Sequence, residues 1–156
     1  MRRKDREITD QAVIKKIFYD CHCCRLGFND KGSVYIVPLN FGYEEIEDKH
    51  ILYFHSASEG RKIDLIKTAG YVGFELDTNF QLNTGETACE YSAKFQSIIG
   101  TGNVSIIENR DQKIHALCCI MQHYTDKNSW DFSPAMIEQT TVFKLEVAEL
   151  SCKEHT

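Results

Sequence analysis

The stretch CRLGFNDKGSVYIVPLNFGY (24–43) decides the expected fold class. Two apolar runs flank the polar segment NDKG (29–32), and Gly32 suits the left-handed backbone that a tight hairpin turn requires. The second run is expected to form a strand over 33–43. Because Pro38 lies inside that strand, it indicates a sheet edge, a bulge or a point where a ligand approaches. The stretch therefore predicts an antiparallel β-hairpin.

Further strands are predicted on the C-terminal side of this hairpin. They are expected over 50–56, 71–80, 91–107 and 140–150, and the polar segment 44–49 is expected to be a turn. Glycines at positions 100 and 102 interrupt the longest of these strands. They indicate a bend or bulge of the kind that barrel strands use.

Three helices are expected between the strands, and each has a candidate start or stop signal. Thr9 is the expected N-cap of the first helix, which ends near Asp20. Ser58 is the candidate N-cap of the second helix, and Gly70 ends it. The third helix begins with the capping pair Asn109 and Gln112, and a short turn of helix opens at Ser133-Pro134.

This pattern of about six strands with three or four helices predicts a mainly β fold with some α structure. Because most strands are connected by hairpins, we expect a small antiparallel barrel with flanking helices. The length of 156 residues, with no repeat and no linker, predicts a single domain over 1–156.

Charge and composition exclude several classes of protein. Lys and Arg number 18 and Asp and Glu number 23, so the net charge is 18 − 23 = −5, which argues against a nucleic-acid partner. No apolar run approaches the length of about 18 residues that a membrane-spanning helix needs, so no membrane association is expected. The basic N-terminus lacks a following apolar segment, and the seven cysteines are odd in number, so a cytoplasmic location is expected.

Cysteine and histidine cluster at Cys21-His22-Cys23-Cys24, and all four are metal-ligand types. Adjacent strand residues point to opposite faces, and no second half-site of similar spacing follows. Buried thiols are therefore favoured over a metal site, and no metal is expected. A thiol- or metal-based sensor built on this cluster is the rival hypothesis.

The segment HSASEGRKIDLI (55–66) has the composition of an anion site. Gly60 lets the backbone approach a ligand, and Arg61 and Lys62 supply positive charge at the expected start of a helix. The free N–H groups and positive dipole end of a helix N-terminus favour a phosphate there. The alternative is a capped helix with two solvated basic residues.

Three blocks that follow one another in the sequence resemble the flavin-binding split-barrel proteins of the pyridoxamine 5′-phosphate oxidase-like superfamily. The blocks are GSVYIVPLNFGYE (32–44), LYFHSASEGRKIDLI (52–66) and ACEYSAKFQSIIGTGNVSIIE (88–108). Within that superfamily they look most similar to the nitroimidazole-resistance proteins. The resemblance covers about 23–150. It implies a six-stranded antiparallel Greek-key split barrel. It also implies a homodimer with FMN, or alternatively FAD, in a groove between the protomers.

The resemblance also implies which residues touch the cofactor. Pro38, Leu39 and Asn40 are expected to contact the flavin ring. His55 and Ser56 are expected to lie at the ring or the ribityl chain, and Arg61 and Lys62 at the phosphate. The segment 91–97 is expected to add a wall to the site, from the same or the partner subunit, through Tyr91, Ser92, Phe95 and Ser97.

The resemblance implies the activity of a flavin-dependent oxidoreductase. The sequence differs, however, from that of the parent enzymes of the superfamily. Pyridoxamine phosphate oxidases end in an Arg- and Trp-containing signature, whereas here the last arginine is Arg110. A nitroreductase-type reaction therefore fits better, with NADPH or NADH as donor and a small flat acceptor such as a nitroaromatic. His55 would donate a hydrogen bond to the acceptor, although taken alone it reads as a structural histidine. The alternatives are a flavin- or haem-binding protein without turnover, or a related oxidase of unknown substrate.

Overall fold

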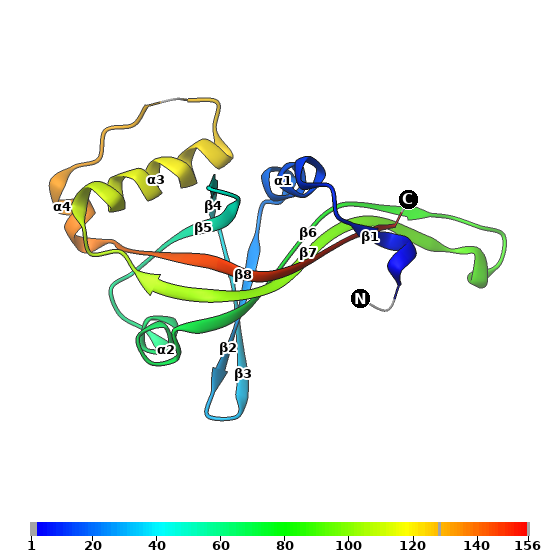
Figure 1. Cartoon of the computed structure of the whole chain (residues 1–156), viewed down its shortest axis with the longest axis horizontal. Helices are drawn as coiled ribbons and strands as arrows, with labels where there is room; N and C mark the ends of the chain where they lie inside the picture. The colour runs from blue at the N-terminus through cyan, green and yellow to red at the C-terminus, as the bar shows by residue number, and fades with distance from the viewer. Residues whose placement is uncertain (1–2, 128, 156) are drawn as a thin grey trace.

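The computed structural model describes residues 3–127 and 129–155, and it is built around one antiparallel sheet. The strands follow the order β3-β2-β6-β7-β8-β5-β4, and β1 pairs with β8 outside that path (Figure 1). Their bounds are β1 Glu7–Ile8, β2 Cys24–Asp30, β3 Ser33–Leu39, β4 Gly42–Ile46, β5 Lys49–Ser56, β6 Tyr71–Asn83, β7 Ser92–Ile106 and β8 Thr141–His155.

The expected class, a mainly antiparallel β fold with flanking helices, is confirmed. The sheet has eight strands in the described part of the chain, against the six expected, and it stays open because β3 and β4 end the strand order. Two differences from the expected strands raise the number of strands from six to eight. The strand expected over 33–43 stops at Leu39 and restarts at Gly42, and the short β1 adds to the edge of β8.

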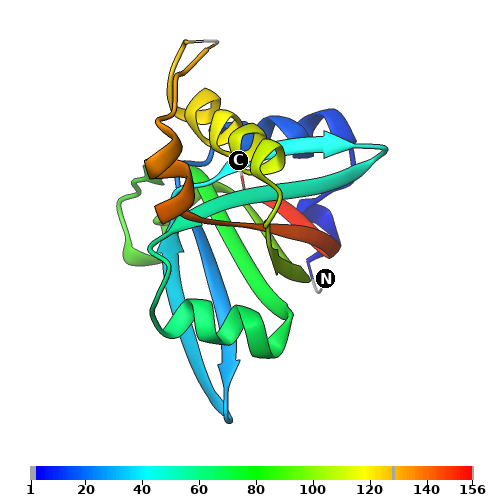
Figure 2. The same ribbon diagram turned by 90° about the vertical axis from the view of Figure 1, so that its left-hand side faces the viewer.

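Four α-helices flank the sheet: α1 Gln11–Asp20, α2 Arg61–Ala69, α3 Arg110–Tyr124 and α4 Pro134–Gln139. Short 3-10 turns lie at η1 Lys4–Arg6 and η2 Ala88–Glu90. Figure 2 shows α3 lying over β4 and β5, while α2 lies on the opposite side of the molecule beside the β2–β3 hairpin. Among the described helices, none combines the length and apolar character needed to cross a membrane.

Helix starts agree only in part with the expectation. Asp10, not Thr9, caps α1, because its Oδ1 accepts from the N–H of Ala12 at 2.8 Å. Ser58 does not cap α2: the N-cap is Gly60, with φ 124° and no side-chain cap. The cap at Asn109 is confirmed, since its side chain accepts from the N–H of Gln112 at 3.0 Å.

The turns and the bulge follow the predicted chemistry. Lys31 and Gly32 have φ values of 53° and 89°, as a two-residue hairpin with left-handed central residues requires. The predicted turn over 44–49 narrows to Glu47 and Asp48, also left-handed at 50° and 63°. The irregularity expected at the interrupted strand is a register shift between Thr101 and Gly102 in the β7–β8 pairing.

Buried apolar side chains form two clusters on opposite faces of the sheet, because alternate residues of β5 belong to different clusters. The larger lies between the sheet and α1 and α2, and contains fully buried residues such as Phe18, Phe28 and Leu76. The smaller lies beneath α3 and consists of Ile51, Tyr53, Ile107, Ala116, Cys119, Ile120 and Val142. Phe54 and Phe143 of neighbouring strands stack with ring centroids 5.1 Å apart. The smaller cluster fixes α3 against β5.

The position of α3 also depends on a close backbone contact with β4. A Cβ atom on Gly42 would lie 2.5 Å from the backbone of Cys119 and Ile120, so only glycine allows this approach. We expect Gly42→Ala to lower the free energy of unfolding by about 1–3 kcal/mol, the usual cost of overpacking. Thermal or denaturant unfolding of the purified variant measures this loss.

The matched control is Gly27→Ala on β2, where the added Cβ would meet its nearest atom, the carbonyl oxygen of Gly73, at 3.8 Å. This variant should unfold close to the native protein. Equal destabilisation by the two substitutions would contradict the close contact between β4 and α3.

Candidate functional site

The N-terminus of α2 differs from those of the other α-helices in its capping. α1, α3 and α4 begin with Asp10, Asn109 and Ser133, whose side chains accept first-turn N–H groups. α2 begins at Gly60 with no such side chain. Its first backbone N–H groups therefore face outward at the positive end of the helix dipole, the arrangement that binds an anion.

Arg61 connects this helix end to the β2–β3 hairpin. Its Nε and Nη2 atoms donate to Oδ2 of Asp30 at 2.8 and 2.6 Å, and its guanidinium lies 4.5 Å from the ring centroid of Tyr35. The two contacts hold the guanidinium plane while leaving the side chain 53% exposed. Arg61 borders an open hollow of about 510 Å³ between the hairpin and α2. The half-buried Lys62 follows it on the same helix turn.

The edge strand β3 carries the first group of expected site residues. Because β3 ends the strand order, one side of its backbone is not used in the sheet and can bond a ligand. Pro38 and Asn40 are exposed, whereas Leu39 packs against the larger apolar cluster. The side chain of Leu39 thus supports the strand, and only its backbone is placed for a ligand.

His55 and Ser56 end β5, where they pair with Val142 and Thr141 of β8. His55 is exposed and Ser56 is half-buried. A short loop leads from them directly into Arg61 and Lys62. The structure therefore brings the second and third groups of expected site residues to one region, at the end of β5 and the start of α2.

The last expected group lies elsewhere. Val104 of β7 donates its N–H to the carbonyl of Gly70 at the end of α2, at 3.0 Å. Ser92 starts the same strand, and a straight strand would extend about 40 Å between the two, at about 3.3 Å per residue. Figure 1 shows this far end of β6 and β7 on the side of the molecule opposite α2. Within one chain, the segment 91–97 does not meet the helix.

The side chains of this remote segment have their own surroundings. Phe95 packs between His155, at a centroid distance of 6.3 Å, and the Lys153 ammonium, 5.2 Å from its ring centroid. Ser97 is buried, Ser92 half-buried and Tyr91 exposed. Phe95 also lines a hollow of about 270 Å³ with residues of β6 and the end of β8.

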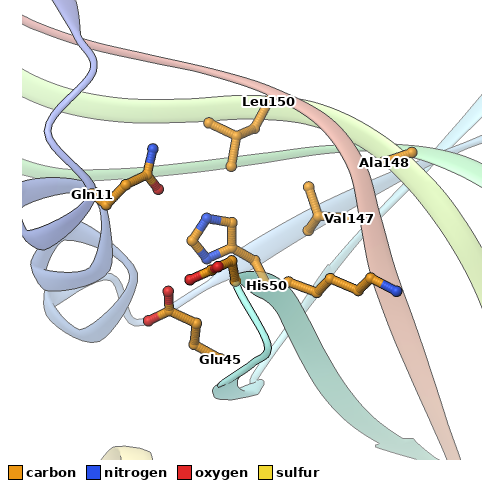
Figure 3. Close-up of a pocket in the computed structure, with 8 residues that line it drawn as sticks. Gln11, Glu45, His50, Val147, Ala148 and Leu150 are labelled. Atoms are coloured by element: carbon orange, nitrogen blue, oxygen red, sulfur yellow. The ribbon is translucent and has the colours of Figure 1, made fainter.

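His50 was not a predicted site residue, but its side chain is buried in the structure. Its Nδ1 hydrogen-bonds the Tyr43 hydroxyl at 2.8 Å, and Phe18 of α1 lies 5.1 Å from its ring. Burial lowers the pKa of His50. Figure 3 shows this ring in the wall of a cavity of about 540 Å³, opposite Gln11 and Leu150. No local sequence signal marks this position, because the burial comes from a helix far away in the chain.

Two further histidines also gain partners from distant segments. His115 lies on α3 with its Nε2 2.9 Å from Glu44 Oε2 and 3.5 Å from Cys119 Sγ. His123 donates from Nε2 to the Cys21 carbonyl at 2.7 Å, and burial lowers its pKa.

The cysteine cluster at 21–24 has the environment of ordinary thiols. Cys21 and Cys24 are buried and Cys23 is half-buried. Burial raises the pKa of Cys21 to about 12 and that of Cys24 well above its usual range. In the described residues, the ligand atoms of this segment do not gather around a common point. The two buried thiols have the environment of small apolar side chains.

Comparison with known proteins gives the class of this fold. The family model described as pyridoxamine 5′-phosphate oxidase matches residues 10–154. A candidate 5-nitroimidazole antibiotic resistance protein from Bacteroides thetaiotaomicron is 32% identical, with 95% of this chain and 86% of that chain covered and a TM-score of 0.82. A search of curated proteins finds no match.

Two more distant structures share the fold. The flavocytochrome Anf3 from Azotobacter vinelandii is 21% identical over 100% of this chain and 72% of that chain, with a TM-score of 0.82. The FAD and heme binding protein from Mycobacterium smegmatis is 13% identical over 96% and 73%, with a TM-score of 0.80. The fold is thus the flavin-binding split barrel. This chain belongs to the pyridoxamine 5′-phosphate oxidase family.

The buried His50 predicts a pH dependence of stability. Its pKa is lower in the folded chain than in the unfolded chain, so the stability it contributes is present above the unfolded pKa and is lost as pH falls below about 6.5. One such group contributes a slope of at most about 1.4 kcal/mol per pH unit. We expect His50→Gln, which can still accept from Tyr43, to reduce the loss of unfolding free energy between pH 7.5 and 5.5.

Urea unfolding of the flavin-free protein at the two pH values measures this slope. His123 contributes in the same direction, so the slope should shrink without vanishing. His55→Gln, at an exposed histidine, is the control and should keep the full slope. An unchanged slope in His50→Gln would contradict a neutral, buried His50.

Proposed function

We propose that this chain binds FMN between two copies of itself and passes electrons from NADPH or NADH to a small flat acceptor such as a nitroaromatic. The observation that carries the proposal is the uncapped N-terminus of α2 with Arg61 and Lys62, in a member of this oxidase family. The resistance function attached to the Bacteroides protein supports the acceptor class, since that protein is 32% identical.

The donor set at α2 fits one phosphate group. Asp30 accepts from Nε and Nη2 of Arg61, and Nη1 is not used in that contact. The Nη1 donors, the Lys62 ammonium and the first N–H groups of α2 can together surround a dianion. Asp30 then acts as the residue that orients Arg61. One helix end with one basic pair favours the single phosphate of FMN over the diphosphate of FAD.

The strand edge and the end of β5 fit the rest of the cofactor. The free backbone groups beside Pro38 and Asn40 can bond the polar edge of an isoalloxazine ring. His55 and Ser56 lie between that edge and the helix along the chain, where the ribityl chain would run. Bound flavin supplies the electron transfer, and the chain supplies binding, orientation and exclusion of water. His55 is proposed to donate a hydrogen bond to the acceptor.

A second copy of the chain is proposed to complete the groove. The outer face of the sheet exposes Val34, Ile36 and Ile99 by 76%, 62% and 53%. The register places these side chains on one face, next to the bare strand positions Gly27 and Gly73. Such a face is suited to cover by another protein surface. A second copy would also bring its segment 91–97 to the groove, which the first copy's own segment does not reach.

Reversing the charge at Arg61 tests the phosphate site. We expect Arg61→Glu to lose more than tenfold in FMN affinity, because a charge-assisted contact of about 1.5–3 kcal/mol is replaced by repulsion. Fluorescence titration of the flavin-free protein with FMN measures the affinity, and mass analysis of the native cofactor distinguishes FMN from FAD. Circular dichroism checks the fold.

Arg110→Glu is the matched control, because Arg110 is the first residue of α3 as Arg61 is of α2. It makes the same change in net charge at the same helix position. This variant should keep native FMN affinity. An equal loss of FMN affinity in the two variants, or no loss in Arg61→Glu, would rule out phosphate binding at α2.

Replacing His55 distinguishes a role in the site from a purely structural role for this residue. Its side chain is exposed, so His55→Ala should change the unfolding free energy by no more than about 0.5 kcal/mol. We expect kcat/KM for a nitroaromatic acceptor to fall about tenfold per bound flavin, because a positioned hydrogen bond is lost. Steady-state oxidation of NADPH or NADH is the assay. Native kinetics together with a lowered melting temperature would exclude His55 from the site.

A further inference from the structure

A second cluster of chemically reactive side chains lies under α3, away from the α2 region. His115 and Cys119 are four residues apart on α3, so they project from the same face of the helix. Glu44 reaches them from β4. The carboxylate oxygen, the imidazole nitrogen and the sulfur all lie within 4.8 Å of one another.

The contacts of this cluster converge on one atom. Glu44 Oε2 is 2.9 Å and Cys119 Sγ is 3.5 Å from the same Nε2 of His115. A nucleophile–base–acid relay would use both ring nitrogens, so the arrangement is not that of a catalytic triad. One proton on Nε2 can serve only one of the two neighbours well. Three ligand atoms within 4.8 Å of one another can instead be arranged around one metal ion.

The distances are close to those of a tetrahedral zinc site. With Zn–N and Zn–O of about 2.0–2.2 Å and Zn–S of about 2.3 Å, ligand atoms in a tetrahedron are separated by about 3.4–3.6 Å. The observed separations of 2.9 and 3.5 Å differ from these by shifts that side-chain rotation can supply. A set of sulfur, nitrogen and oxygen ligands suits zinc better than the oxygen-seeking magnesium or calcium ions.

The surroundings hold the ligands in place. The Tyr53 hydroxyl donates to Glu44 Oε2 at 2.9 Å, and its ring meets the His115 ring edge-on at a centroid distance of 5.9 Å. Such outer partners orient metal ligands in known sites. Cys119 and Tyr53 are buried, while the His115 side chain is 53% exposed. Burial raises the pKa of the Cys119 thiol to about 12 in the metal-free chain, so zinc binding must release that proton. The cluster is therefore closed on the protein side and open to solvent on the other.

The backbone of the fold sets the spacing of these groups. Gly42 lets β4 approach the backbone at Cys119 and Ile120 of α3. Glu44 lies two positions further along β4, on the same face of the strand as Gly42. The glycine that permits the close contact thus also brings the carboxylate under the helix.

We propose that Glu44, His115 and Cys119 bind one zinc ion, with water completing a four-coordinate site. The site shares no residue with the proposed flavin groove, so the two proposals stand independently. Its open fourth position leaves room for an exchangeable ligand. The alternative is a hydrogen-bonded histidine–glutamate pair with a neighbouring thiol and no affinity for a cation.

The test uses the full-length protein, stripped of metal with a chelator and dialysed. Zinc chloride is then titrated in by calorimetry in the presence of a competing chelator of known affinity. Cobalt(II) chloride is titrated in parallel, and difference spectra report the thiolate-to-cobalt charge-transfer band and the visible bands of a four-coordinate ion. The variants are Cys119→Ser, Glu44→Gln and the control Cys118→Ser, whose half-buried thiol lies beside the cluster but outside it.

We expect the native protein and Cys118→Ser to bind one zinc ion per chain. Cys119→Ser should lose the charge-transfer band and at least about tenfold in zinc affinity, and Glu44→Gln should weaken binding while keeping the band. Flavin content should stay native in all variants, which separates this result from the flavin proposal. Native zinc affinity in Cys119→Ser, or absence of zinc binding by the native protein, would overturn the site. Circular dichroism of Glu44→Gln guards against a variant that fails to fold.

Discussion

The pairing of β7 with β8 is the constraint on which the rest of this structure depends. A Cβ on Gly100 or Gly102 would lie 2.3 Å from a carbonyl oxygen of β8, so glycine is needed at both positions. Between them the register shifts, and the strands bend at that point as a bulge allows. The bend separates the two halves of these long strands. One half lies beside α2, and the other extends away with the segment 91–97.

Under the proposed function, this geometry would leave one chain with only parts of the flavin site. The uncapped helix end, Arg61 and the free edge of β3 lie together around the β2–β3 hairpin. The proposal assigns the segment 91–97 and the exposed apolar face to contacts with a second copy. In a chain of net charge −5, the cationic helix end is also a local exception. Asp30 limits its positive charge and fixes the direction of the guanidinium.

Local signals in the sequence were sufficient for most of the fold. The NDKG turn, the Asn109 cap, Gly70 and the interrupted strand at Gly100 all act within a few residues, so their chemistry could be predicted from neighbours alone. Thr9 and Ser58 were wrong as caps because several adjacent residues could each serve. The split at Asn40 was missed because β4 is positioned by α3, which follows it by about 70 residues along the chain.

The candidate sites also combine residues marked by local sequence patterns with residues placed by distant elements. Arg61 and Lys62 could be found because anion binding at a helix start is a local pattern. His50, His115 and His123 could not, since each obtains its partner from a distant element: Phe18 of α1, Glu44 of β4 and the Cys21 carbonyl. The metal-ligand types that are adjacent in sequence lie at 21–24, where no metal was predicted. The ligand atoms that converge in space come from positions 44, 115 and 119.

We propose that flavin is held between two copies of the chain. Light scattering coupled to size-exclusion chromatography, with flavin absorbance recorded at the same time, is the decisive measurement of this arrangement. At micromolar concentration we expect one flavin-containing species of about twice 18.0 kDa. A species of 18.0 kDa that retains its flavin would exclude it.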